Sequence, residues 1–155
     1  MRVTLTKKGK GLEKLLALAD QAKRRPFVKV GVLGKTAVRD LGLDNVALAV
    51  THEFGVPGRI PSRPFLRSTF DLKRDDWGNL LARLITKALK GSITVEQVLG
   101  LIGQRASADV RNRITVGTSP FVPNAPFTIA QKGSSRPLVD TGRLVQSISY
   151  QVVSR

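Results

Sequence analysis

The sequence predicts an α+β fold, in which a small, mostly antiparallel sheet is packed with two longer helices and several short helices, with an extended loop rich in Pro, Gly and Arg. Short runs of period two lie near both ends of the chain, and two long stripes of helical period lie in its middle. Strands and helices do not alternate regularly, which argues against a doubly wound parallel sheet. A chain of 155 residues that is 41% hydrophobic fits one domain, residues 1–155, with its own core.

Three segments are expected to form strands: residues 2–6, 27–33 and 147–153. The first and the last alternate between apolar and polar side chains, which is typical of strands with one buried face. The middle segment, Phe-Val-Lys-Val-Gly-Val-Leu, is rich in β-branched residues and is the strongest of the three predictions.

Two short helices are predicted in the first third of the chain. Leucine and alanine side chains at helical spacing over residues 12–19 indicate an amphipathic helix, which Pro26 ends. A second helix is expected over residues 45–54, because Asp44 can accept a hydrogen bond from its first turn and Gly55 can close it.

The two longer helices are predicted over residues 77–90 and 95–114, each of which carries a continuous apolar stripe. Thr94 followed by Gln97 fits a capping box at the start of the second helix. A loop-rich region is expected over residues 117–136, because it contains three prolines, although a short helix fits near its end.

Two glycines, Gly100 and Gly103, lie inside the second long helix. Each lowers the stability of a helix interior by about 1 kcal/mol relative to alanine. Close packing of the helix is one physical reason for glycine at such positions.

The charge of the chain is extreme, with 26 Lys and Arg against 11 Asp and Glu and a formal net charge of +15. Such a surface attracts polyanions or acidic protein faces, although a merely solvated surface is the simpler interpretation. A small basic protein that binds nucleic acid non-specifically is therefore an alternative function. Only 5% of the residues are aromatic and no helix-turn-helix pattern is present, so sequence-specific recognition is not expected.

The triplet Asp140-Thr141-Gly142 matches the catalytic triplet of retroviral-type aspartic proteases. In those enzymes a flap and further strands follow the triplet, whereas here only a short segment follows it up to Arg155. The preferred interpretation is structural: Asp140 caps the turn that starts at Thr141, and Gly142 permits a tight backbone. A helical turn or two is expected over residues 141–147.

Other patterns that suggest an enzyme or a cofactor site are incomplete. His52-Glu53 begins a zinc-protease motif, but the chain has one histidine and no cysteine, so no metal site is expected. Gly34-Lys35-Thr36 resembles the end of a phosphate-binding loop, but Lys29 stands where the motif requires glycine. No catalytic residue, cofactor or membrane-spanning segment is therefore expected.

Two segments carry a pattern of a known family. The first contains Glu-Phe-Gly at residues 53–55 and Pro-Ser-Arg-Pro-Phe-Leu-Arg at residues 61–67. The second is Pro-Leu-Val-Asp-Thr-Gly-Arg-Leu-Val-Gln-Ser-Ile at residues 137–148. In this order, and separated by a long helical middle, they resemble the tail-completion and virion-morphogenesis proteins of tailed bacteriophages, also called neck or head–tail joining proteins. The rest of the chain matches that family in character only.

The resemblance implies a structural, non-enzymatic virion protein that is assembled in the bacterial cytoplasm. It implies a closed homo-oligomeric ring, with a hexamer favoured, at the end of the tail next to the head. The partners would be the adjacent connector or stopper protein and the tail-tube protein. Genomic DNA in the lumen of the ring is a further possible contact, and no membrane partner is implied.

The loop before residue 65 is stiffened by prolines, which lowers the entropy cost of ordering it at an interface. Phe65 and Leu66 are either apolar anchors for a partner or packing residues of the helix that they begin, and the sequence leaves both open. The expected subunit or partner interface comprises Arg59, Ile60, Arg63, Phe65, Leu66 and Arg67. The expected contacts to DNA in the lumen, or to an acidic partner, are Arg24, Arg25, Lys35, Arg111 and Arg113.

Overall fold

The computed structural model describes residues 10–33, 44–116, 121–140 and 142–154. The strand predicted over residues 2–6 lies outside these ranges, as do Lys35 and Thr141. The described residues form six helices and a two-stranded antiparallel sheet, which confirms the predicted α+β class.

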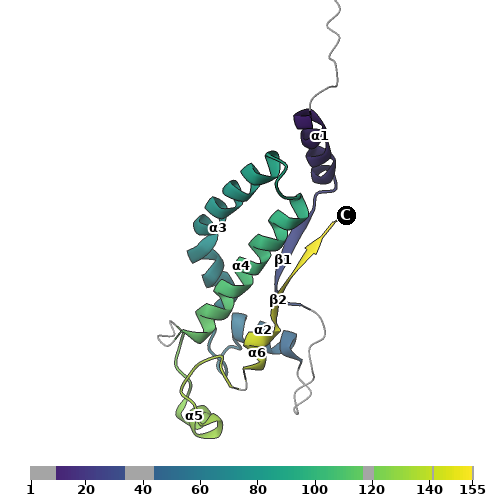
Figure 1. Cartoon of the computed structure of the whole chain (residues 1–155). Helices are drawn as coiled ribbons and strands as arrows, with labels where there is room; N and C mark the ends of the chain where they lie inside the picture. Colours follow the sequence, from purple (N-terminus) through teal and green to yellow (C-terminus); the bar gives the residue numbers. More distant parts are fainter. Residues whose placement is uncertain (1–9, 34–43, 117–120, 141, 155) are drawn as a thin grey trace, which may run out of the picture.

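An antiparallel pair of long helices dominates the structure (Figure 1). They are α3, Phe65–Leu89, and α4, Val95–Thr115, and the capping box predicted at the start of α4 is present. Helix α3 begins at Phe65, where the sequence indicates a helix start, and it runs without a break through the helix predicted over residues 77–90. The first turns of α3 carry many charged residues, and their helical conformation depends on a cap from elsewhere in the chain, as described below.

The sheet joins two strands from opposite ends of the described chain, β1, Phe27–Val32, and β2, Ile148–Val153. They pair in antiparallel register, and both were predicted within a residue of their bounds. Helix α4 packs on this sheet and α3 packs on α4. A Cβ atom at Gly103 would lie 2.5 Å from Cδ2 of Tyr150, so the close packing expected at this glycine is confirmed.

Four short helices complete the fold: α1, Lys10–Lys23; α2, Asn45–Phe54; α5, Pro126–Lys132; and α6, Arg143–Ser147. Helix α2 begins and ends as the sequence predicted, with a carboxylate oxygen of Asp44 accepting a hydrogen bond from the amide of Ala47 at 2.6 Å. Helix α5 lies within the predicted loop-rich region, and it sits at the opposite end of the molecule from α1 (Figure 1).

Apolar side chains are buried in two clusters. The larger lies where α2, α3, α4 and α6 meet, and Phe65 and Ile148 are fully buried within it. The smaller joins α1 to the other end of the long helices, around Leu84 and Val98. None of the described helices combines the length and apolar character needed to cross a membrane.

Candidate functional site

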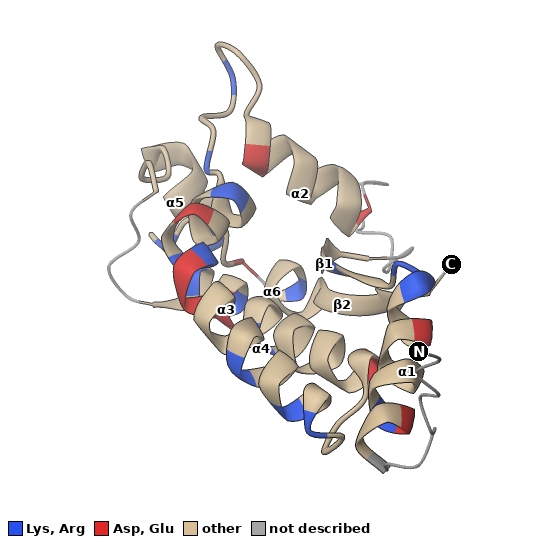
Figure 2. Cartoon of the chain, turned by 90° about the horizontal axis from the view of Figure 1, so that it is seen from above, with Lys and Arg blue, Asp and Glu red and all other residues tan. Residues whose placement is uncertain are grey.

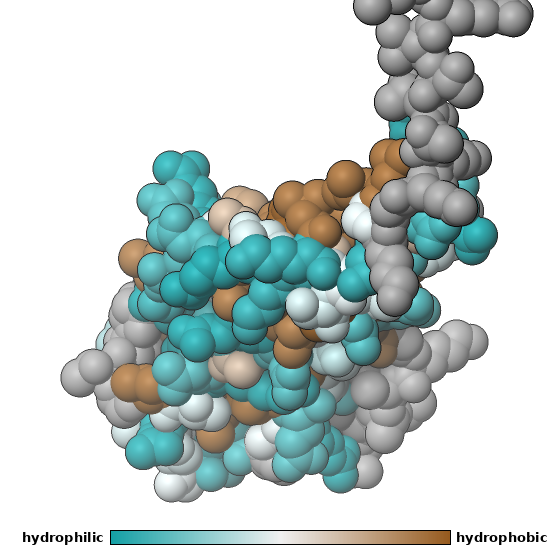
Figure 3. Space-filling view, turned by 45° about the horizontal axis from the view of Figure 1, so that its top comes forward, coloured by the Kyte–Doolittle hydropathy of each residue, from teal (hydrophilic) through white to brown (hydrophobic). Residues whose placement is uncertain are grey.

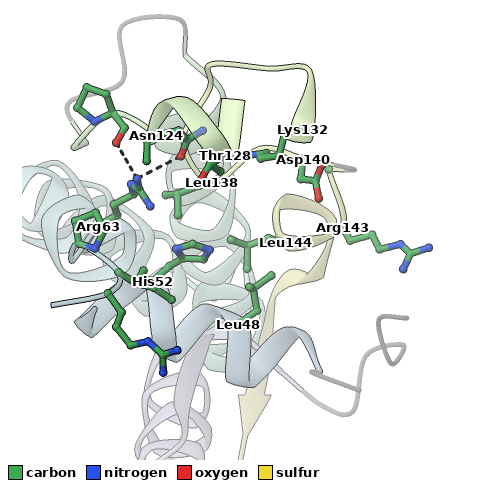
Figure 4. A pocket seen from close by; sticks show the side chains of 16 residues that line it. Leu48, His52, Arg63, Asn124, Thr128, Lys132, Leu138, Asp140, Arg143 and Leu144 are labelled. Carbon is green, nitrogen blue, oxygen red and sulfur yellow. Dashed lines mark hydrogen bonds between the residues drawn. The ribbon is translucent and has the colours of Figure 1, made fainter. Parts of the chain in front are cut away.

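The two segments that carry the family resemblance meet at one cleft, although the long helices separate them in the sequence. The cleft lies between α2, α5 and α6 and encloses about 410 Å³. Figure 4 shows His52 and Leu48 of α2 facing Leu138 and Leu144 across it. The structure therefore builds a single site from both segments.

Glu53 holds the first segment together. Its side chain is almost fully buried, and its Oε2 and Oε1 accept hydrogen bonds from the backbone amides of Leu66 and Arg67, both at 2.9 Å. These amides belong to the first turn of α3, where no earlier carbonyl in the helix is available to them. The N-cap residue Pro64 supplies no side-chain hydrogen bond, so a carboxylate from α2 caps α3 instead.

The turn between α2 and α3 requires the glycine that follows Glu53 and Phe54. Gly55 has φ of 76°, and a Cβ atom there would lie 2.8 Å from the carbonyl oxygen of Ile60 and from the amide nitrogen of Ser62. The chain then folds back, and the amide of Arg63 donates to the carbonyl of His52 at 2.7 Å. Glycine at this position therefore permits the close turn that brings α3 against Glu53.

Arg63 fastens the start of α3 to the segment before α5. Its side chain is only 5% exposed, and Nε donates to the carbonyl of Val122 at 2.8 Å. Nη2 donates to the carbonyl of Pro123 at 3.0 Å and to Oδ1 of Asn124 at 3.3 Å. All these acceptors are neutral, and desolvation by burial lowers the pKa of Arg63 below its ordinary value. The cation is thus buried without a carboxylate partner among the described residues.

The second segment closes the main core and lines the same cleft. Leu144 is buried in the core beside the fully buried Ile148. Gly142 has φ of 76° and is the N-cap residue of α6, which confirms the tight backbone predicted there. Helix α6 begins at Arg143, and because the expected cap by Asp140 is on a turn at Thr141, outside the described residues, it stays a prediction. Asp140 is exposed and lies at the mouth of the cleft (Figure 4).

Two residues expected at a partner interface are buried inside the chain instead. Phe65 is fully buried in the main core, so it packs its own molecule and is not an anchor for a partner. Arg63 is also buried, and its Nε and Nη2 donate to the neutral oxygen atoms described above, so it is not part of an exposed interface around Phe65. Leu66 is partly buried against the main core.

The other expected interface residues lie nearer the surface. Arg67 remains half exposed, but its Nε is 3.0 Å from Oε1 of Glu53 and its guanidinium lies over the Phe54 ring. Arg59 is exposed and Ile60 is partly buried, and both line the cleft. Arg59 is therefore the member of this group whose side chain is open to solvent and makes no hydrogen bond or ion pair within the described residues.

The predicted cations of α4 also take part in the fold. Nε of Arg111 donates to the carbonyl of Ile148 at 3.1 Å, which ties α4 to the start of β2. The guanidinium carbon of Arg113 lies 5.8 Å from the centre of the Phe121 ring. Replacement of Arg111 and Arg113 by Glu would therefore disturb the fold as well as any contact with DNA, so an effect of this change would not by itself indicate that these residues bind DNA.

The structure does not gather the predicted cations into one patch. Arg24 lies in a hollow with Thr94 and Glu96, at the start of α4, whereas Arg111 lies near its end. At about 1.5 Å per residue, these two positions are separated by roughly 20 Å along the helix axis. Figure 2 shows Lys and Arg spread over α1, α3 and α4. Arg25 adjoins Arg24 in the turn before β1 and has φ of 44°.

The sequence marks the two segments but not the cleft between them. Asn124 and Thr128 line this cleft, yet they lie in the region predicted as loop, and no periodicity indicates them. Within the described ranges, no group of three or more His, Cys, Asp or Glu side chains is placed to hold a metal ion.

The chain matches no protein-family model, no curated protein and no solved structure. The motif segments and their geometry are thus the basis for a functional proposal.

Proposed function

We propose that this chain is a structural virion protein of a tailed bacteriophage, a ring-forming neck or tail-completion subunit at the junction of head and tail. One observation carries the proposal. The two segments that resemble this family converge on one cleft, and their residues have linked structural roles. Glu53 caps α3, Arg63 fixes the segment before α5, and Ile148 completes the core. Such interdependence supports the view that the two segments are one pattern.

Apolar surface at separate places supports the ring. A subunit in a cyclic ring uses two different faces, one for each neighbour. Leu12, Leu15 and Leu16 are exposed on α1, and Figure 3 shows apolar surface beside that helix. At the other end of the molecule, Phe127 of α5 is 78% exposed. Exposed apolar side chains at opposite ends fit head-to-tail contact between subunits, and a hexamer is the favoured ring.

The charge of +15 fits neighbours of opposite charge, either acidic faces of the connector or stopper and tail-tube proteins, or DNA in the lumen. The protein would accordingly reside in the virion after assembly in the bacterial cytoplasm. No described cluster of cations favours the alternative of a free nucleic-acid-binding protein, because the basic residues are distributed over several elements.

The proposal is tested by electron microscopy of lysates from a phage or prophage in which this gene is deleted. We expect filled heads that lie apart from tails, or tails of abnormal length, and we expect the gene supplied on a plasmid to restore virions. Detached tails of normal length would indicate joining, and overlong tails would indicate termination. Intact virions in normal numbers would refute the proposal and favour the nucleic-acid alternative.

A further inference from the structure

The lining of the cleft between α2, α5 and α6 suits a ligand that carries an anionic group next to an apolar group. Its wall is apolar where Leu48, Leu138 and Leu144 face one another (Figure 4). Asn124 and Thr128 add polar groups on the α5 side. A partly open cleft that combines apolar walls with converging polar groups is a common form of a site for a small ligand group.

The charged residues that line the cleft are mostly cations. Arg59, Arg63, Lys132 and Arg143 line it, against Asp140 alone. Arg59 and Arg143 are exposed, and neither side chain has a hydrogen bond or an ion pair within the described residues. Figure 4 shows Arg143 extending outward at the mouth. An incoming anion would therefore meet cations that the fold has not already paired.

Arg63 makes the inner wall cationic. Arg63 is only 5% exposed, and its Nε and Nη2 donate to neutral oxygen atoms only. Nη1 has no partner among the described residues. A buried guanidinium without a countercharge is costly, and a carboxylate that enters the cleft would relieve part of that cost.

We propose that this cleft binds a carboxylate-bearing segment of an acidic partner protein, in which the carboxylate lies next to a leucine or a similar apolar side chain. The apolar wall and the small extent of the cleft disfavour a phosphate backbone, which binds along extended cationic surfaces. A second copy of this chain fits poorly, because the chain has 11 acidic residues against 26 basic ones. Of those acids, Glu53, Asp76 and Asp109 are already paired. The inference depends on the cleft alone and not on the proposed function.

The test uses the full chain and a fluorescein-labelled peptide, Gly-Gly-Ser-Leu-Asp-Leu, with a free C-terminal carboxylate. Fluorescence anisotropy should show saturable one-to-one binding, and the peptide with Asn for Asp and a C-terminal amide should bind far less. Exposed charge pairs contribute up to about 1 kcal/mol each, so Arg59→Gln with Arg143→Gln should weaken binding about tenfold. Thr128→Trp should abolish binding by filling the cleft, with the circular dichroism spectrum unchanged.

The matched control is Arg83→Gln with Lys87→Gln, which removes the same charge from exposed positions of α3. It should leave peptide binding within twofold of the original. Equal weakening by both double variants, or equal binding of the amide peptide, would overturn the proposal in favour of general charge attraction. Displacement of the peptide by oligothymidylate at equal charge would favour nucleic acid. Absence of binding at millimolar peptide, or blockage of the cleft by self-association in sedimentation experiments, would also overturn it.

Discussion

Replacement of Glu53 by alanine should destabilise the whole fold, because this side chain connects two helices. The carboxylate accepts hydrogen bonds from the amides of Leu66 and Arg67 at the start of α3. It is 4% exposed, so its removal leaves a small cavity as well as two amides without an acceptor. We expect the loss to appear in global unfolding, since Phe65, in the same turn of α3, is at the centre of the main core.

The magnitude follows from these two amides. A buried donor without an acceptor costs about 1–3 kcal/mol. Arg67 is half exposed, so water can reach its amide once the carboxylate is gone, and the lower part of that range applies to it. The sum is about 3 kcal/mol for Glu53→Ala. Glu53→Gln keeps one acceptor oxygen and loses the charge at the helix N-terminus, so it should cost about half as much.

The assay is urea unfolding at fixed protein concentration, followed by circular dichroism and by the fluorescence of Trp77, which lies on α3. The matched control is Glu96→Ala, since Glu96 is also in the first turn of a helix but is exposed. Its loss should cost no more than about 0.5 kcal/mol. If Glu53→Ala destabilised the protein no more than Glu96→Ala, the capping role of Glu53 would be wrong.

Two further pairs of variants test packing. Gly103→Ala should destabilise the protein by about 1–3 kcal/mol, because the added Cβ meets the Tyr150 ring. At Gly100 an added Cβ meets nothing within 4 Å, so Gly100→Ala should stabilise the protein by up to about 1 kcal/mol. Urea unfolding measures both variants, and equal effects would contradict the packing of α4 on the sheet. Phe65→Ala should cost about 3–5 kcal/mol, whereas Phe127→Ala, at an exposed position, should leave the melting temperature of the monomer unchanged. A large loss of monomer stability in Phe127→Ala would show that this side chain packs within its own chain.

The sequence predicted best those elements whose boundaries depend on nearby residues. Helix α2 begins after Asp44 and α4 begins after Thr94, and each cap binds an amide three residues later in the chain. Strands β1 and β2 show their own alternation or β-branched composition, and were predicted within a residue of their bounds. Interactions over so few residues leave a pattern that can be read without knowledge of the fold.

The cap of α3, the burial of Arg63 and the choice between the two roles of Phe65 could not be derived in this way. The cap of α3 is Glu53, which lies in α2, before the connection between the two helices. It can reach the amides of α3 only because the chain turns back at Gly55. Arg63 looks like a surface cation until the carbonyls of Val122 and Pro123 come within reach. These partners are distant in the sequence, so no local periodicity reports them.

By itself, the sequence determined the α+β class and most of the element boundaries, because these depend on periodicity, caps and residue order. The tertiary structure alone decided that the two segments share one cleft, and that Phe65 and Arg63 lie inside the molecule while Arg59 and Arg143 face solvent. The physical reason is that burial and charge pairing depend on which distant segments pack together.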